Sequence, residues 1–140
     1  MKKIAEAIFI LVLAGILLSR VQKTDAETIP PEQRINAEPF RVECTAYCDD
    51  GITASGKPTI EGLTIAGAAE WMGCAAVLYE VDPDGGIGDI IGIYQFTDTG
   101  YGRDGDIPRG ETIDLYMQKP DACREWGRKD VYLQIVDGKG

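Results

Sequence analysis

Beyond Pro39, the chain alternates between short runs of apolar or β-branched residues and clusters of Gly, Pro and Asp. Runs of this length, bounded by turn-forming residues, are typical of strands in an all-β domain. The pattern predicts strands at Arg41–Tyr47, Leu63–Ala66, Ala75–Val81, Ile90–Thr97, Thr112–Tyr116 and Val131–Val136. Because closing such a sheet removes its exposed edges, we expect a small six-stranded β-barrel.

A single short helix is predicted over Lys119–Arg128. Pro120 suits the first turn of a helix, and Ala122, Cys123 and Trp126 are spaced so that they share one face. This spacing places Cys123 in the core. Between the third and fourth strands, the Asp-Gly step in Asp82–Gly86 supplies the positive φ that a hairpin connection needs.

The first forty residues differ in character from the rest. Lys2 and Lys3 precede an uncharged apolar run from Ala7 to Leu18. A positive start followed by about a dozen apolar residues is typical of an export signal, and it is shorter than the roughly 20 residues of a comfortable transmembrane helix. We expect a signal peptide or signal anchor at 1–23, a flexible linker at 24–40 and the barrel domain at 41–137.

Composition narrows the possible functions. A net charge of −9 and a pI near 4.4 argue against nucleic-acid binding, which requires clustered Lys and Arg. The chain contains no histidine, which excludes Ser-His-Asp and Cys-His catalysis. Proton transfer by a side chain would therefore fall to carboxylates, Lys, Tyr or Cys.

The four cysteines leave two interpretations open. Cys44 and Cys48 have a C-x3-C spacing, and in an exported chain they could form a disulfide. Metal binding is the weaker interpretation, because Cys74 and Cys123 are isolated and zinc sites of this type need two close pairs or histidines. We expect neither a metal nor a cofactor.

The motif QFTDTG, which contains Asp98, raises the possibility of an aspartic-type protease. Such an enzyme needs two aspartates that share a proton, from two copies of the Asp-Thr-Gly triplet or from a dimer. This chain has one triplet. A Gly-Arg-Asp sequence at 102–104 follows almost at once, in a glycine-rich loop, so it does not match the later element of a retroviral-type protease.

A second carboxylate, Asp114 in ETIDLYM, lies on a predicted strand. Alternation along that strand turns Asp114 to the face opposite Ile113 and Leu115, where it can line a groove and face Asp98. The alternative is structural. Asp98 would bond the backbone N–H groups of the loop Tyr101–Gly110, and Asp114 would be solvated.

Several motifs occur together in an order that resembles a known family. TAYCDDGITASG, TIAG, TDTG, IDLYM and ACREWGRKDVYLQIV follow one another as in the 3D domain, the three-aspartate module of cell-wall lytic proteins. The set, which covers Cys44 to Val136, also resembles the catalytic barrel of the membrane-bound lytic transglycosylase A family. The resemblance implies a double-psi β-barrel that cleaves the MurNAc–GlcNAc bond of peptidoglycan without water and leaves a 1,6-anhydro sugar.

The resemblance also assigns roles to residues. Asp114 matches the acid/base aspartate and Asp98 its partner, while Thr53 and Ser55 match a loop that borders the substrate groove. The expected partners are peptidoglycan glycan strands and, through the N-terminal segment, the membrane. We expect a monomer located outside the cytoplasm, either membrane-anchored or secreted to the cell wall.

One departure from the family pattern concerns its first aspartate. The family places this aspartate after the TIA segment, where this chain reads Gly67-Ala68-Ala69, and Glu70 is the nearest carboxylate that could compensate. The loop between Asp98 and Asp114 is also longer than in the family. A barrel that binds glycan strands without cutting them therefore remains the alternative function.

Overall fold

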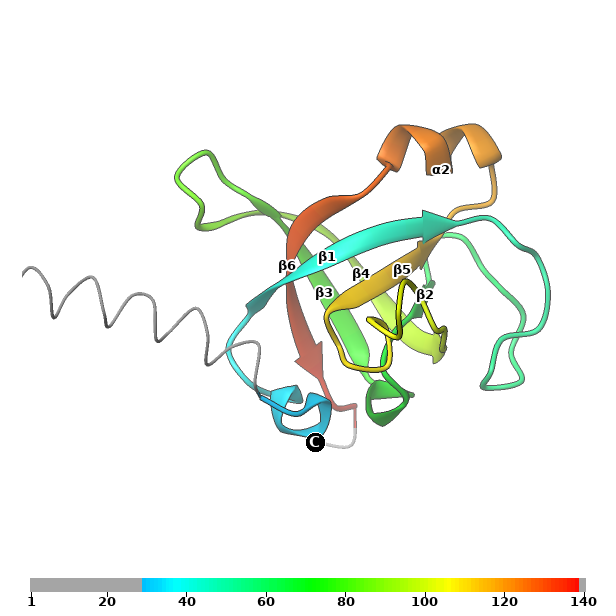
Figure 1. Cartoon of the computed structure of the whole chain (residues 1–140), viewed down its shortest axis with the longest axis horizontal. Helices are drawn as coiled ribbons and strands as arrows, with labels where there is room; N and C mark the ends of the chain where they lie inside the picture. The colour runs from blue at the N-terminus through cyan, green and yellow to red at the C-terminus, as the bar shows by residue number, and fades with distance from the viewer. Residues whose placement is uncertain (1–28, 139–140) are drawn as a thin grey trace, which may run out of the picture.

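The computed structural model describes residues 29–138 (Figure 1). Its elements are η1 (Pro31–Arg34), β1 (Phe40–Tyr47), β2 (Thr64–Ala66), η2 (Ala69–Trp71), β3 (Ala75–Val81), β4 (Ile87–Asp98), β5 (Thr112–Tyr116), α2 (Pro120–Trp126) and β6 (Lys129–Val136). Over these described residues, the predicted mostly-β fold with six strands and one short α-helix is confirmed. The expected signal segment at 1–23 lies outside the described residues.

The six strands form a closed barrel in the order β1-β5-β2-β4-β3-β6. β1 pairs with β5 and β2 with β4 in parallel, and the other neighbouring pairs are antiparallel. β6 returns to β1, with Val131 opposite Val42, which closes the sheet as expected from the need to remove its edges. The three-residue strand β2 therefore lies between the strands that carry Asp114 and Asp98.

Alternating apolar side chains fill the barrel. Ile113 and Leu115 of β5 are 0% and 2% exposed, and Val131, Leu133 and Ile135 of β6 are fully buried. This period of two is the property of a strand that sends successive side chains to opposite faces.

The short helix η2 adds the largest buried side chain to this core, because it delivers Trp71 onto Phe96 of β4. The two ring centroids are 5.3 Å apart. The core thus extends from the barrel interior to the connection between β2 and β3.

The hairpin between β3 and β4 extends further than the sequence predicts. β4 begins at Ile87, three residues before the expected start at Ile90, and Figure 1 shows the hairpin in green projecting away from the barrel. Gly88 and Gly92 interrupt the β-branched pattern, and register shifts along β3 disturb the alternation. At the tip, the N–H of Asp82 donates to the carbonyl oxygen of Gly86 at 2.9 Å, as expected of a hairpin turn.

The segment 29–39 packs against the barrel, in contrast to the flexible linker expected for 24–40. The guanidinium group of Arg34, a residue only 6% exposed, donates to the carbonyl oxygens of Ile29 at 2.9 Å and Gly110 at 2.8 Å. The indole N–H of Trp71 donates to the carbonyl oxygen of Pro31 at 2.7 Å. These bonds involve main-chain carbonyls, so a search for apolar periodicity does not detect them.

A disulfide between Cys44 and Cys48 is incompatible with the fold. Cys44 is buried within β1, and Cys48 follows the end of that strand. Four residues of extended strand span about 13 Å, whereas disulfide-bonded Cα atoms lie within about 7 Å. Both cysteines, and Cys123 as well, carry free thiols.

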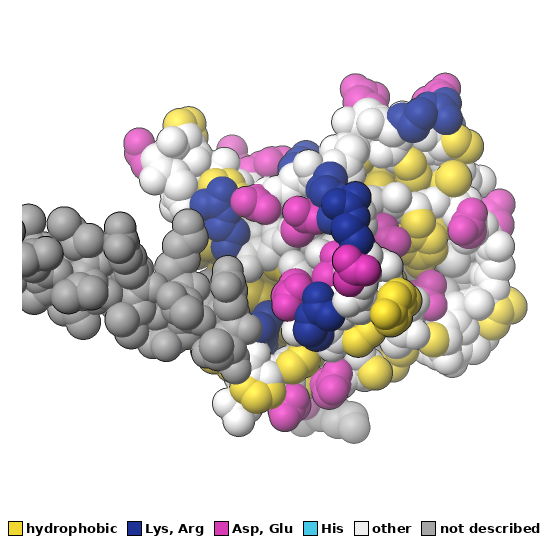
Figure 2. All heavy atoms as spheres, viewed as in Figure 1, with side chains coloured by type: hydrophobic (Ala, Val, Ile, Leu, Met, Phe, Trp, Pro, Cys, Tyr) yellow, Lys and Arg dark blue, Asp and Glu magenta, His cyan; other side chains and the backbone are white. Residues whose placement is uncertain are grey.

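The surface combines charges of both signs. Figure 2 shows Lys and Arg side chains lying among acidic ones on the face in view. Arg41 pairs with Asp130 at 3.1 Å, and Arg109 pairs with Glu111 at 2.9 Å. Within residues 29–138, no helix has the length and apolar character required to cross a membrane.

Candidate functional site

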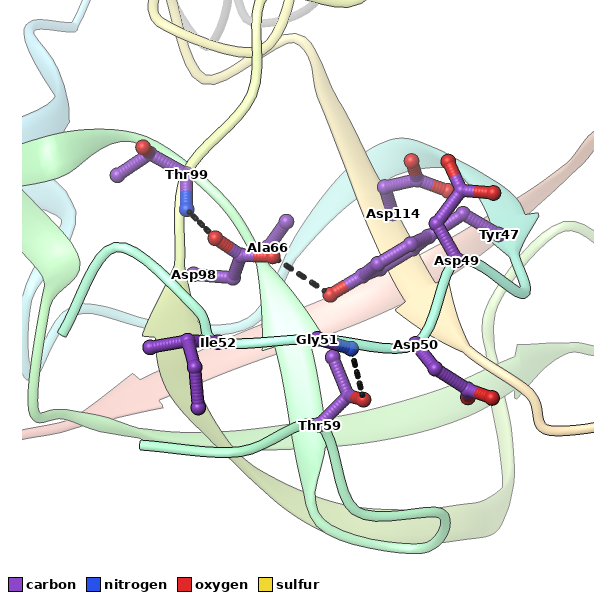
Figure 3. Close-up of a pocket in the computed structure, with 10 residues that line it drawn as sticks. All are labelled: Tyr47, Asp49, Asp50, Gly51, Ile52, Thr59, Ala66, Asp98, Thr99 and Asp114. Carbon is purple, nitrogen blue, oxygen red and sulfur yellow. Dashed lines mark hydrogen bonds between the residues drawn. The ribbon is translucent and has the colours of Figure 1, made fainter. Parts of the chain in front are cut away.

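A pocket of about 320 Å³ opens beside the end of β2, between β4 and β5 (Figure 3). Ala66 pairs with Asp98 on one side and with Asp114 on the other. Adjacent strands lie about 4.8 Å apart, so two strand spacings place the backbones of the two aspartates roughly 10 Å from each other. Both aspartates line the pocket, together with Tyr47 and Asp49.

Asp114 projects from the middle of β5 away from the core. Its neighbours Ile113 and Leu115 are buried, so the predicted alternation is found. The Thr45 hydroxyl donates a hydrogen bond of 2.9 Å to its Oδ1. Burial raises the pKa of Asp114 above its ordinary value, and the charges of Asp98 and Asp49 raise it further, while the bond from Thr45 lowers it. Asp114 is therefore the carboxyl group of the pocket best suited to holding a proton.

Asp98, at the end of β4, has a different environment. Its Oδ1 accepts bonds from the main-chain N–H groups of Ala54 and Thr99, each at 3.0 Å, and its Oδ2 accepts one from the Tyr47 hydroxyl at 2.8 Å. Burial raises the pKa of Tyr47, and its bond to Asp98 adds to the effect, so Tyr47 remains a donor at ordinary pH. Three donors hold this carboxylate in one orientation, as Figure 3 shows for Tyr47 and Thr99.

The structural role considered as an alternative for Asp98 is found in part. Asp98 does bond backbone N–H groups, but those of Ala54 and Thr99, not those of the loop 101–110. That loop is held by Asp106, which accepts bonds from the Arg103 N–H at 2.8 Å and the Thr112 hydroxyl at 2.9 Å. Among the described residues, no hydrogen bond joins Asp98 to Asp114, so the pocket lacks the proton-sharing pair of an aspartic protease.

Two tyrosines that the sequence analysis missed organise the pocket rim. Tyr47 on β1 and Tyr116 on β5 are register partners, and their rings meet edge to face with centroids 5.5 Å apart. Tyr47 bonds Asp98, and the Tyr116 hydroxyl bonds Asp50. The signal that could have identified Tyr47 is the alternation of side chains along β1, because Thr45 and Tyr47 share the face of that strand opposite the buried Cys44.

The predicted substrate contacts Thr53 and Ser55 do not line the pocket. Thr53 is buried, and its hydroxyl bonds the Lys57 carbonyl oxygen at 2.8 Å and lies 2.9 Å from the Ser55 hydroxyl. Their side chains shape the loop that presents the Ala54 N–H to Asp98. Glu70, the nearest carboxylate to the missing first aspartate, is exposed on η2 and lies outside the pocket lining.

The chemistry available in the pocket is that of carboxyl groups. Between residues 29 and 138, no cluster of three or more Cys, Asp or Glu side chains is arranged to hold a metal ion. The pocket instead combines one half-buried carboxyl group, whose pKa is raised above its ordinary value by burial, with one fixed carboxylate. Such a pair can support general acid and base catalysis.

Comparisons with known proteins bear on the fold alone. No protein-family model matches the chain, and no curated protein sequence matches it significantly. Among solved structures, the barrel is similar to a Streptomyces papain inhibitor (SPI), with a TM-score of 0.50 and 19% sequence identity. The match covers 71% of this chain and 94% of the inhibitor. It shows that the chain shares a small barrel fold with that protein.

Proposed function

We propose that this protein is a lytic transglycosylase that cleaves the MurNAc–GlcNAc bond of peptidoglycan and leaves a 1,6-anhydro sugar. The observation that carries the proposal is the environment of Asp114. Its carboxyl group is half-buried, has a raised pKa, receives a single side-chain hydrogen bond from Thr45 and lines an open pocket. These are the properties of a general acid that later acts as a base.

The reaction needs one acid/base group. Protonated Asp114 gives its proton to the glycosidic oxygen as the bond from that oxygen to C1 of MurNAc breaks. The resulting carboxylate then takes the proton from the C6 hydroxyl while the C6 oxygen bonds to C1. This step regenerates the acid and closes the anhydro ring, whereas a hydrolase would need a second carboxylate as nucleophile or water activator.

Asp98 has a supporting role in this proposal. Positive charge develops at C1 and the ring oxygen when the glycosidic bond breaks. A carboxylate that Tyr47, Ala54 and Thr99 already hold in place can stabilise that charge without reorganising. Asp98 would thus act by electrostatics, and Asp114 by proton transfer.

Two further observations support the proposal. The motifs from TAYCDDGITASG to ACREWGRKDVYLQIV resemble those of 3D-domain and membrane-bound lytic transglycosylase A proteins. The closed six-stranded barrel has two parallel pairs, β1 with β5 and β2 with β4, which we interpret as a double-psi barrel. On this basis we place the protein outside the cytoplasm as a monomer, held at the membrane by its N-terminal segment or secreted to the cell wall.

A non-catalytic glycan-binding barrel is the second candidate. It is favoured by Gly67-Ala68-Ala69, which offers no carboxylate where the family has its first aspartate. Ala68 is buried and Glu70 lies outside the pocket lining, so neither of these two residues supplies that carboxylate. A barrel of this kind would bind the same glycan strands and release no product.

Incubation of the full-length chain with purified peptidoglycan separates the candidates. We expect mass spectrometry to detect anhydro-muropeptides with the wild type, none with Asp114→Asn, and wild-type amounts with Asp89→Asn, a matched change at an exposed site on β4. Asparagine keeps the shape of the side chain and removes the acid. Reducing MurNAc ends would indicate a hydrolase, and binding without product would favour the second candidate. Normal turnover by Asp114→Asn would refute the role of Asp114.

A further inference from the structure

Two cysteines meet where β1, β5 and α2 come together, beside the pocket rim. The Met117 N–H donates to the Tyr47 carbonyl oxygen at 2.8 Å, so Cys48, the next residue after Tyr47, lies next to Met117. The Cys123 thiol donates to the Met117 carbonyl oxygen at 3.6 Å. Burial, and then the nearby Cys48 thiol, raise the pKa of Cys123. Both residues are partly exposed.

The position of Cys123 is fixed by the packing of α2. The indole N–H of Trp126 donates to the Cys44 carbonyl oxygen at 3.2 Å, which anchors the end of the helix on β1. The ammonium group of Lys129 lies over the Trp126 ring, 3.7 Å from its centroid. With the helix held in this way, Cys123 stays close to the residue that follows β1.

The segment after Cys48 forms part of the pocket. Asp49, Asp50 and Gly51 line it, and Asp50 is bonded to Tyr116 of β5. A covalent link at Cys48 would therefore anchor the residue that directly precedes this rim segment to α2.

We propose that Cys48 and Cys123 are a disulfide site whose oxidation ties the pocket rim to α2. The oxidant is a low-molecular-weight disulfide. The Cys48 thiolate attacks one sulfur of that disulfide, forms a mixed disulfide and releases one small thiolate. The Cys123 thiolate then attacks the Cys48 sulfur, closes the protein disulfide and releases the second. The two cysteine protons end on the released thiols, and the two electrons lost by the protein reduce the oxidant.

Cys44 does not compete for Cys48. It is fully buried in the barrel, and burial raises the pKa of its thiol to about 12, with the charge of Asp114 adding to the effect. A buried thiol with so high a pKa is a poor nucleophile. Burial also raises the pKa of Cys123, so we expect the second exchange step to accelerate as pH rises.

The test is disulfide mapping on the full-length chain. The protein is equilibrated with oxidised glutathione, alkylated without reductant and digested with chymotrypsin, which cleaves after Tyr47 and Trp126 and so separates Cys48 from Cys44. We expect one cross-linked pair that joins the Cys48 and Cys123 peptides. Alkylation of both Cys48 and Cys123, or a cross-link from either to another cysteine, would overturn the proposal.

Melting temperature provides a second readout. Oxidation should raise the melting temperature of the wild type by roughly 10 °C or more, because the bond closes a loop of about 75 residues in the unfolded chain. Cys48→Ser and Cys123→Ser should lose this gain, while Cys44→Ala should keep it. A cross-linked wild type with no thermal gain would show that the bond strains the folded barrel, and would overturn the proposal that the fold provides a disulfide site there. Neither peptide mass nor melting temperature depends on glycan cleavage, so a failure here leaves the proposed function intact.

Discussion

Asp98→Asn tests how the two pocket aspartates divide their roles. The substitution removes the charge but keeps the shape of the side chain. The amide oxygen can still accept bonds from the Ala54 and Thr99 N–H groups, and the Tyr47 hydroxyl can rotate to accept one from the amide nitrogen. Charge-assisted bonds become neutral ones, so we expect the free energy of unfolding to fall by about 1–2 kcal/mol and the barrel to stay folded.

The effect on catalysis should be larger than the effect on folding. A preorganised charge beside a developing charge stabilises a transition state by about 2–4 kcal/mol, which corresponds to a loss of roughly 30- to 800-fold in kcat. The same substitution changes the pH dependence. Burial is the main cause of the raised pKa of Asp114, and the charge of Asp98 adds to it, so removing that charge lowers this pKa.

The assay is the rate of anhydro-muropeptide release as a function of pH. Activity requires protonated Asp114, so it is present below the pKa of Asp114 and is lost as pH rises through it. This loss of activity is the basic limb of the pH–activity profile. We expect Asp98→Asn to move the basic limb to lower pH. Because the chain has no histidine, imidazole cannot cause a limb near neutrality.

The matched control for this experiment is Tyr47→Phe, which removes one donor from Asp98 but keeps its charge. It should leave the basic limb near its wild-type position and reduce kcat less than Asp98→Asn does. An unchanged limb together with an unchanged kcat in Asp98→Asn would show that the charge of Asp98 does not act on Asp114, and the proposed division of roles would be refuted.

Three other variants test the site and its support. Thr45→Val removes the hydrogen bond that lowers the pKa of Asp114, so the basic limb should move to higher pH, and a shift to lower pH would contradict this account. Arg34→Met removes one buried and one partly buried bond to main-chain carbonyls and should lower the free energy of unfolding by about 2–3 kcal/mol in urea titration, whereas Arg41→Met, at an exposed ion pair, should have little effect. Gly102→Ala should destabilise the fold by about 2–4 kcal/mol, because φ is 69° and the added Cβ would collide with Asp106 Oδ1. A melting temperature equal to the wild type would refute this.

The local pattern of apolar and polar residues was sufficient to predict the strands and the orientation of Asp114. Ile113 and Leu115 are buried on either side of it, and this alternation can be read from five residues of sequence. The order of strands in the barrel could not be read in this way. Ala66 lies between Asp98 and Asp114 because β2 pairs with both β4 and β5, and these are contacts between segments distant in the sequence.

Bonds to the main chain account for much of what the sequence did not reveal. Thr53 and Ser55 were predicted to contact substrate, but the group from their loop that reaches the site is the N–H of Ala54, which any residue except proline would supply. Similarly, the expected linker is held to the barrel by Arg34 and by Trp71, whose partners are carbonyl oxygens. Such partners carry no side-chain signature in a sequence.

Asp106, Asp98 and Asp114 differ in how completely they are hydrogen-bonded, and this difference indicates their roles. Asp106 is buried and held by a main-chain N–H and a hydroxyl, so it fixes a loop. Asp98 faces the pocket with three donors, which suits a permanent charge. Asp114 faces the same pocket with one donor and a raised pKa, so its charged form is the least compensated. A carboxyl group that gives up and regains a proton in each turnover needs this incomplete compensation, because additional donors would lower its pKa and remove the acid.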